Sequence, residues 1–244
     1  MNALSRLLVL TAAVSFPLLG SAQTDIGTIL ADSSRPQADR DIDDQRMPAD
    51  VLGFLGVGAG DHVADLLAGG GYYTRILVPL VGPNGRVYAG NNPFYMGFFA
   101  DAFNALLAEP RFRNVVRIDG PVDQLALPTD GSLDVVLMSQ AYHDLLLTDE
   151  DRDEMNRRIF RALKPGGVYG IIDHAARSGT GTADTESLHR IDRQFIVDEV
   201  SKAGFRLVGD LDVLANPADD HTAAIFAPEI RGHTDRFVLK FEKP

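Results

Sequence analysis

The chain has 244 residues, a formal net charge of −11 and no cysteine. The acidic balance argues against nucleic acid and anionic lipid as partners, because both would be repelled. The missing cysteines exclude a disulfide framework. The length suffices for one domain with a sizeable core.

The first 22 residues have the pattern of a secretory signal peptide. Arg6 is their only charged side chain, residues 7–19 are apolar, and residues 20–22 are small. The apolar run is shorter than the roughly 20 residues of a membrane-spanning helix. We therefore predict cleavage, export to the periplasm or beyond, and no membrane association of the mature chain. Residues 23–45 are predicted to form an extended or partly helical arm, and residues 46–244 a single domain.

From residue 48 onward, helical and apolar segments alternate. The pattern predicts strands at 62–66, 86–89, 115–118, 133–138 and 168–172, with two late strands at 205–211 and 236–241. Helices are predicted at 48–55, 72–80, 95–107, 149–163 and 188–203. Strands that alternate with helices predict an α/β fold with a largely parallel sheet and helices on both faces.

Three consecutive glycines separate the first strand from its helix. Asp65 ends the strand, and Gly69, Gly70 and Gly71 follow it. Glycine permits positive φ and has no Cβ, so a loop of this kind lets a ligand approach the backbone. An ordinary turn is the alternative interpretation.

Polar residues follow the other strands as well. A ligand of an open α/β sheet lies beyond the carboxyl ends of its strands. His143 and His174 come after two of these strands and are the best candidates for a catalytic base, since histidine titrates near neutral pH. Asp173 is not expected to orient His174, because neighbours on an extended chain point in opposite directions. Asp144 is either a ligand contact or a helix cap.

A metal site is a rival interpretation of the same residues. His143, His174 and Asp173 are candidate ligands, with His189 as a further one. No His-x-x-x-His spacing occurs, so we predict no metal. The roles of His189, His221 and His233 are left open by the sequence.

Three arginines in the late part of the chain also have two interpretations. Arg190, Arg231 and Arg236 either clamp an anionic substrate or tie the late segment to the body by ion pairs. The second interpretation is favoured.

Several motifs resemble those of class I S-adenosylmethionine-dependent methyltransferases. They are the glycine loop and residues 125–128, 131–136 and 163–167, and the resemblance covers roughly residues 50–210. Residues 188–192, 216–220 and 231–237 resemble an exported bacterial subgroup more closely. The resemblance implies a Rossmann-like, mostly parallel seven-stranded sheet with an antiparallel last strand.

The resemblance also implies a cofactor site for S-adenosylmethionine. Gln140 and Tyr142 would flank the sulfonium, and Tyr142 joins His143 and His174 as a candidate catalytic residue. The implied cofactor-binding residues are Asp65, Gly69, Gly70, Gly71, Asn91 and Gln140.

Three residues depart from the family pattern. Leu67 stands in place of the first glycine, Asn91 in place of the carboxylate on the ribose, and Pro121 in place of an adenine contact. The ribose thereby loses a charge-assisted acceptor, although an amide oxygen still accepts hydrogen bonds. Cofactor binding is expected to be weakened rather than lost.

These observations predict methyl transfer from S-adenosylmethionine to a small molecule. Two alternatives stay open: an exported, non-catalytic binding protein on a degenerate methyltransferase fold, and a metal-dependent enzyme that uses the histidines after the strands. The substrate and the oligomeric state are not indicated by the sequence.

Overall fold

The computed structural model describes residues 25–244, so the predicted signal peptide lies outside the described residues. Within them, no helix combines the length and apolar character needed to cross a bilayer.

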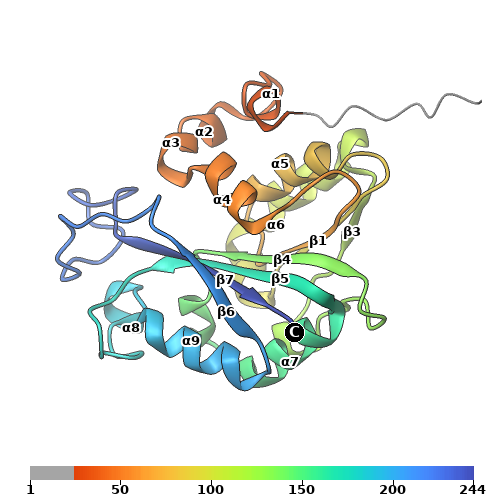
Figure 1. Cartoon of the computed structure of the whole chain (residues 1–244). Helices are drawn as coiled ribbons and strands as arrows, with labels where there is room; N and C mark the ends of the chain where they lie inside the picture. Colours follow the sequence, from red (N-terminus) through yellow and green to blue (C-terminus); the bar gives the residue numbers. More distant parts are fainter. Residues whose placement is uncertain (1–24) are drawn as a thin grey trace, which may run out of the picture.

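Seven strands form one sheet in the order β3-β2-β1-β4-β5-β7-β6 (Figure 1). Strand β7 runs antiparallel to both its neighbours, whereas the other pairs are parallel. This confirms the predicted Rossmann-like fold with an antiparallel last strand. The strands are β1 (His62–Leu66), β2 (Arg86–Gly90), β3 (Val115–Arg117), β4 (Leu133–Ser139), β5 (Leu163–His174), β6 (Arg206–Leu211) and β7 (Arg236–Glu242).

Helices cover both faces of the sheet (Figure 1). One face carries α4 (Pro48–Leu55), α5 (Tyr72–Val81) and α6 (Pro93–Ala108), and the other α7 (Arg152–Ala162) and α9 (Arg193–Lys202). Alternate residues of β4 point to opposite faces of the sheet. Val135 and Leu137 belong to the core under α4, α5 and α6, whereas Val136 and Met138 belong to the core under α7 and α9. A strand buried on both faces is expected to be apolar, as Val135–Met138 of β4 are.

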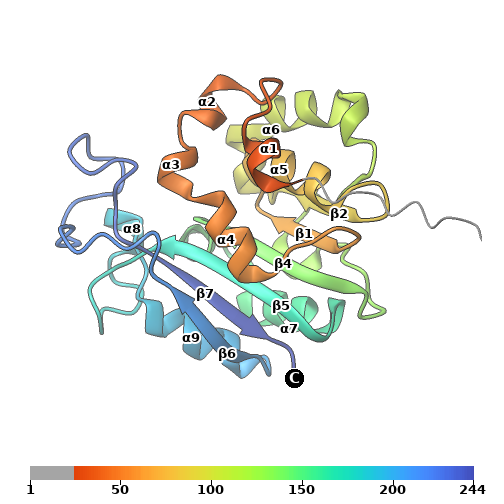
Figure 2. The ribbon, with the colours of Figure 1, turned by 45° about the horizontal axis from the view of Figure 1, so that its top comes forward.

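Short elements complete the fold. The loops that connect the longer elements contain the 3-10 turns η1 (Pro110–Phe112), η2 (Val122–Gln124) and η3 (His143–Leu147). The arm contains α1 (Ile26–Leu30), α2 (Gln37–Arg40) and α3 (Asp43–Arg46), which lie beside α4 and α5 (Figure 2). Arg35 pairs with Asp43 at 2.7 Å, and the Tyr72 hydroxyl of α5 donates to Asp43 Oδ1 at 2.6 Å. These contacts fix the arm against the domain.

The predicted helix at 188–203 begins later in the structure, at Arg193, and residues 189–192 before it form a turn after a separate short helix. Helix α8 (Thr185–Leu188) ends at His189, whose φ of 54° is left-handed. A new helix, α9, starts after Asp192, which caps it by accepting the backbone N–H of Gln194 at 2.9 Å. The predicted start at residue 188 was therefore wrong, because the turn at His189 and the Asp192 cap place the start of α9 at Arg193.

Candidate active site

A cavity of about 800 Å3 opens beyond the carboxyl ends of β4 and β5. The arm, α6, the segments after β4 and β5, and the loop 212–235 contribute to its wall. Gln140, His143 and His174 line it, so three of the predicted site residues come together. Gln140 and His189, which also lines the cavity, have positive φ values of 55° and 54°. Non-glycine residues in this region are strained, and such strain clusters at functional sites.

His143 is held between two carboxylates. Its Nδ1 lies 2.6 Å from Asp173 Oδ1, and its Nε2 lies 3.2 Å from Asp144 Oδ1. Because a carboxylate only accepts, Nδ1 carries a proton. Burial opposes the charged imidazolium, but the two carboxylates outweigh it and raise the pKa of His143 to about 10. Without another ligand, His143 is therefore a cation at neutral pH and a poor proton acceptor.

His174 has the opposite electrostatic surroundings. Its Nδ1 lies 2.7 Å from Thr234 Oγ1, and its ring faces the His143 ring at 5.8 Å. Burial, followed by the charge on His143, lowers its pKa well below the usual value. His174 is thus neutral at pH 7 and able to accept a proton. As expected, Asp173 does not bind the His174 ring. It orients His143 instead, which the sequence did not indicate.

Tyr142 lies outside the cavity, contrary to its predicted place beside the sulfonium. Its hydroxyl donates to Glu199 at 2.6 Å and accepts from Asn156 at 2.9 Å, and its side chain is fully buried. The 3-10 turn that begins at His143 directs these neighbours to different sides. Tyr95 of α6 occupies the cavity wall and donates to Asp144 Oδ2 at 2.9 Å.

The glycine loop contains three residues with left-handed backbone conformation. Leu67, Gly69 and Gly71 have φ values of 53°, 57° and 88°. Leu67 therefore adopts a backbone conformation that is normally left to glycine. At the end of β1, Asp65 accepts the Thr74 hydroxyl at 2.6 Å. Burial raises the pKa of Asp65 to about 6 against the opposing effect of this hydrogen bond.

Asn91 is turned toward the loop. Its Oδ1 accepts the Gly69 N–H at 2.8 Å and its Nδ2 donates to the Gly69 carbonyl at 3.0 Å. The side chain is 1% exposed. The amide therefore ties the end of β2 to the glycine loop, and one lone pair of Oδ1 and one N–H of Nδ2 are not used by this pair of bonds.

Helix α6 packs on the other side of the same loop. A Cβ at Gly71 would press on the end of the Leu106 side chain, and the positive φ at this position also favours glycine. The Phe99 ring lies 3.8 Å from the position of a Cβ at Gly69, and it also lines the cavity. Phe99 thus stands between the glycine loop and the cavity.

These residues fit S-adenosylmethionine in part. The family resemblance would place the amino-acid end of the cofactor at the loop backbone and Asp65, and Gln140 lines the adjoining cavity. Asn91 already binds Gly69 through one acceptor and one donor, and its side chain is buried. Phe99 is 37% exposed, and a ring with an exposed edge can change rotamer on a fast timescale. The fit therefore requires the ring of Phe99 to turn away from Gly69.

Arginines gather at the other end of the cavity. Arg46, Arg231 and Arg236 line it, and none of them forms a salt bridge within residues 25–244. Burial, followed by the charge of Arg46, lowers the pKa of Arg236. Arg190 has a different role, since it pairs with Asp219 at 2.8 Å in a fully buried contact. The interpretation as an ion-pair tie is thus confirmed for Arg190, whereas Arg231 and Arg236 face the cavity.

The structure brings only some of the candidate metal ligands together. Asp173 and His174 do not belong to a ligand group, while His143, Asp144 and His189 have ligand atoms within 4.8 Å of one another. Asp144 and His189 were not predicted to meet, since 45 positions separate them. Of the other histidines, His221 lies 2.9 Å from Asp235 and does not line the cavity.

Comparison with known proteins agrees with this architecture. Residues 64–171 match the family described as a methyltransferase domain. The chain is 32% identical over 120 residues to demethylmenaquinone methyltransferase of Lactobacillus johnsonii, a match that covers 49% of this chain and 46% of that relative. The chain thus spans less than half the length of this curated relative.

Two solved structures share the fold. A SAM-dependent methyltransferase from Aquifex aeolicus has a TM-score of 0.59 at 19% identity, covering 90% of this chain and 99% of its own. The geranyl diphosphate C-methyltransferase of Streptomyces coelicolor, solved with Mg2+, geranyl diphosphate and S-adenosyl-L-homocysteine, has a TM-score of 0.60 at 14% identity, covering 88% and 89%. Residues 64–171 thus resemble a methyltransferase domain, and the chain shares the fold of these two solved structures.

Proposed function

We propose that this protein is an S-adenosylmethionine-dependent methyltransferase that acts on a small molecule in the cavity. One observation carries the proposal: a cavity with a neutral imidazole, His174, adjoins the glycine loop across the ring of Phe99. The methyltransferase-domain match and the curated relative support the choice of methyl donor.

The chain's own residues have separable roles in this proposal. The cofactor supplies an electrophilic methyl group when it is bound, and Asp65 with the backbone of Gly69 and Gly71 would hold its amino-acid end. His174 lines the cavity with a neutral imidazole, so it is the group that would take the proton of the acceptor's hydroxyl or amine. Methyl transfer otherwise depends on alignment, which the walls of the cavity supply.

The lining of the cavity indicates the class of acceptor. Phe94, Phe98 and Phe226 provide apolar surface, while Arg231 and Arg236 provide positive charge without a carboxylate partner in the described residues. Arginine binds carboxylate and phosphate through a planar set of donors. We propose an acceptor with an aromatic or aliphatic body and an anionic group.

Export remains part of the proposal through the predicted signal peptide. Because the chain has a formal net charge of −11, we also propose that neither nucleic acid nor an anionic membrane is a partner. A non-catalytic binding protein is the alternative, and the engagement of Asn91 with Gly69 favours it.

Calorimetric titration of the chain without its predicted leader, using S-adenosylmethionine and S-adenosylhomocysteine, tests the proposal. Binding of one molecule per chain is the expected result. No heat with either compound at millimolar concentration would overturn the methyltransferase proposal. Binding of small anionic aromatics under those conditions would then identify a binding protein.

A further inference from the structure

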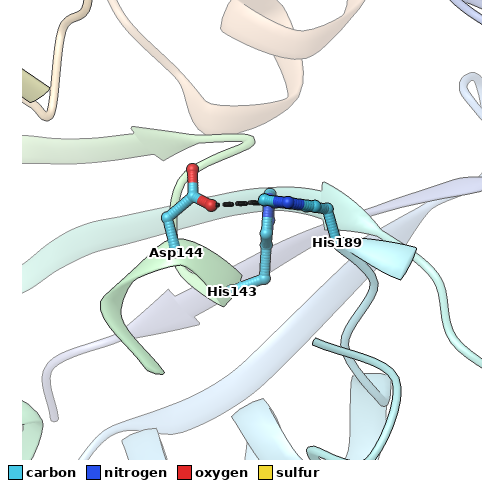
Figure 3. A group of neighbouring side chains, drawn as sticks. All are labelled: His143, Asp144 and His189. Atoms are coloured by element: carbon cyan, nitrogen blue, oxygen red, sulfur yellow. Dashed lines mark hydrogen bonds and ion pairs between the residues drawn. The ribbon is translucent and has the colours of Figure 1, made fainter. Parts of the chain in front are cut away.

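We propose that His143, Asp144 and His189 bind one divalent transition-metal ion in the cavity. His143 and Asp144 belong to η3 after β4, and His189 follows α8. Figure 3 shows the two rings and the carboxylate turned toward a common point. This inference goes beyond the proposed methyl transfer and does not depend on it.

The spacing of the ligand atoms suits one shared ion. His143 Nε2 and His189 Nδ1 each lie 3.2 Å from Asp144 Oδ1. Two ligand atoms about 2.1 Å from an ion stand roughly 3.0 Å apart at a right angle and roughly 3.4 Å apart at a tetrahedral angle. Both separations fall between these values, and all three ligand atoms lie within 4.8 Å of one another, so each histidine is already at ligand spacing from Asp144.

Two of the proposed ligands, His143 and Asp144, are oriented by hydrogen bonds to the atoms that would not contact the ion. Asp173 accepts from His143 Nδ1 at 2.6 Å, which directs the lone pair of Nε2 at the proposed ion. The Tyr95 hydroxyl donates to Asp144 Oδ2 at 2.9 Å and leaves Oδ1 for coordination. A carboxylate behind a ligating histidine fixes its tautomer and raises its basicity. Asp173 is fully buried and also accepts the backbone N–H of His143 at 2.9 Å, so it is itself rigidly placed.

The third ligand is placed by an unusual backbone conformation. His189 has a φ of 54°, and its ring packs against His143 at 5.6 Å and against Phe226 at 5.0 Å. Hydrogen bonds from the turn hold this geometry, because the His189 N–H donates to the Thr185 carbonyl at 3.0 Å. A strained residue whose side chain points into a cavity is typical of functional sites.

The donor set indicates the class of ion. Two imidazoles and one carboxylate suit Zn2+, Fe2+ and similar ions, whereas Mg2+ and Ca2+ prefer oxygen ligands. All three ligands border the cavity, so the remaining coordination positions face the space proposed for the acceptor. An anionic oxygen of the acceptor is the ligand expected there.

A bound proton is the competing explanation of the geometry. Without metal, a His143 imidazolium can donate to Asp173 through Nδ1 and to Asp144 through Nε2. This arrangement needs no contribution from His189. The two explanations therefore differ in what removal of His189 does to metal affinity.

The chain offers a matched pair of variants for this test. His189 and His221 both have positive φ, at 54° and 60°, and each faces an aspartate, Asp144 and Asp235. Glycine relieves the backbone strain at both positions, so His189→Gly and His221→Gly are expected to fold. Only the first removes a proposed ligand.

Metal-stripped protein is titrated with Zn2+ by calorimetry and with Co2+ by visible absorption. We expect one ion per chain in the wild type and the His221→Gly variant, and an affinity at least roughly tenfold weaker in His189→Gly and Asp144→Asn. Circular dichroism confirms that the variants are folded. No binding to the wild type at millimolar metal, or equal binding to all four proteins, would overturn the proposal. A failure to bind adenosyl compounds would leave it standing.

Discussion

The side-chain amide of Asn91 forms two hydrogen bonds with the backbone of one residue, Gly69, at 2.8 and 3.0 Å. Asn91 follows β2 and Gly69 belongs to the loop after β1, so the pair joins the ends of adjacent strands. At a position where the related family usually carries a carboxylate, this chain has a residue that both donates and accepts. The amide thereby stabilises the glycine loop.

An Asn91→Asp substitution tests this relationship. A carboxylate cannot donate to the Gly69 carbonyl and places negative charge beside it, so the free energy of unfolding should fall by about 1–3 kcal/mol. Urea unfolding measures the change. The same substitution at the exposed Asn104 of α6, which accepts from Arg117, should have little effect. If Asn91→Asp is as stable as the wild type, the amide pair does not hold the loop.

Phe99 is expected to limit cofactor affinity. Its ring lies 3.8 Å from the Cβ position of Gly69, and a site that is open only part of the time binds more weakly by the open fraction. Phe99→Ala should therefore strengthen binding of S-adenosylhomocysteine by roughly three- to tenfold. Phe98→Ala is the control, since Phe98 is 71% exposed on the same helix. Calorimetry that finds weaker binding in Phe99→Ala would show that the ring supports the cofactor instead of excluding it.

The sequence was sufficient for the sheet and for part of the site. Parallel strands share one carboxyl edge, so residues after β4 and β5 such as Gln140, His143 and His174 had to meet near one another. The apolar run of β4 and the glycines after β1 also have their expected positions. Chain topology is enough for inferences of this kind, because they depend on which strand a residue follows.

Side-chain direction and long-range packing could not be read in the same way. Tyr142 precedes His143 directly, yet it points into the core toward Glu199, because the turn between them rotates the chain. Asp144 and His189 meet because α8 packs against η3. Asn91 has its predicted location, and its two bonds to Gly69 were not indicated by the sequence. Each outcome depends on a rotamer or a tertiary contact, which a local sequence pattern does not specify.

Asp65 should make stability depend on pH. Its pKa rises from 3.8 to about 6 on folding, chiefly through burial. Because the folded value is the higher one, its contribution is fully present below pH 3.8 and is lost as the pH rises through about 6. The loss amounts to roughly 3 kcal/mol for two pKa units. Relative to the wild type, Asp65→Asn should therefore gain stability between pH 4 and pH 7, as measured by urea unfolding at each pH. A difference that stays constant over this range would contradict the raised pKa.

The buried pair Arg190–Asp219 is expected to hold the loop 212–235 over the cavity. Arg190 also donates to the carbonyls of Ala223 and Ala175, at 2.9 and 3.0 Å, and so joins the loop to the end of β5. Arg190→Ala leaves the Asp219 carboxylate without its buried partner, which typically costs about 3–5 kcal/mol. We expect a lower free energy of unfolding and faster proteolysis within residues 212–235. Arg206→Ala is the control, because its pair with Glu242 is exposed and such pairs contribute about 0–1 kcal/mol. If both variants lose the same free energy of unfolding, the Arg190 pair does not anchor the loop. A large loss in Arg190→Ala alone, with cleavage confined to residues 212–235, would show that the buried guanidinium positions Arg231 and Phe226 at the cavity.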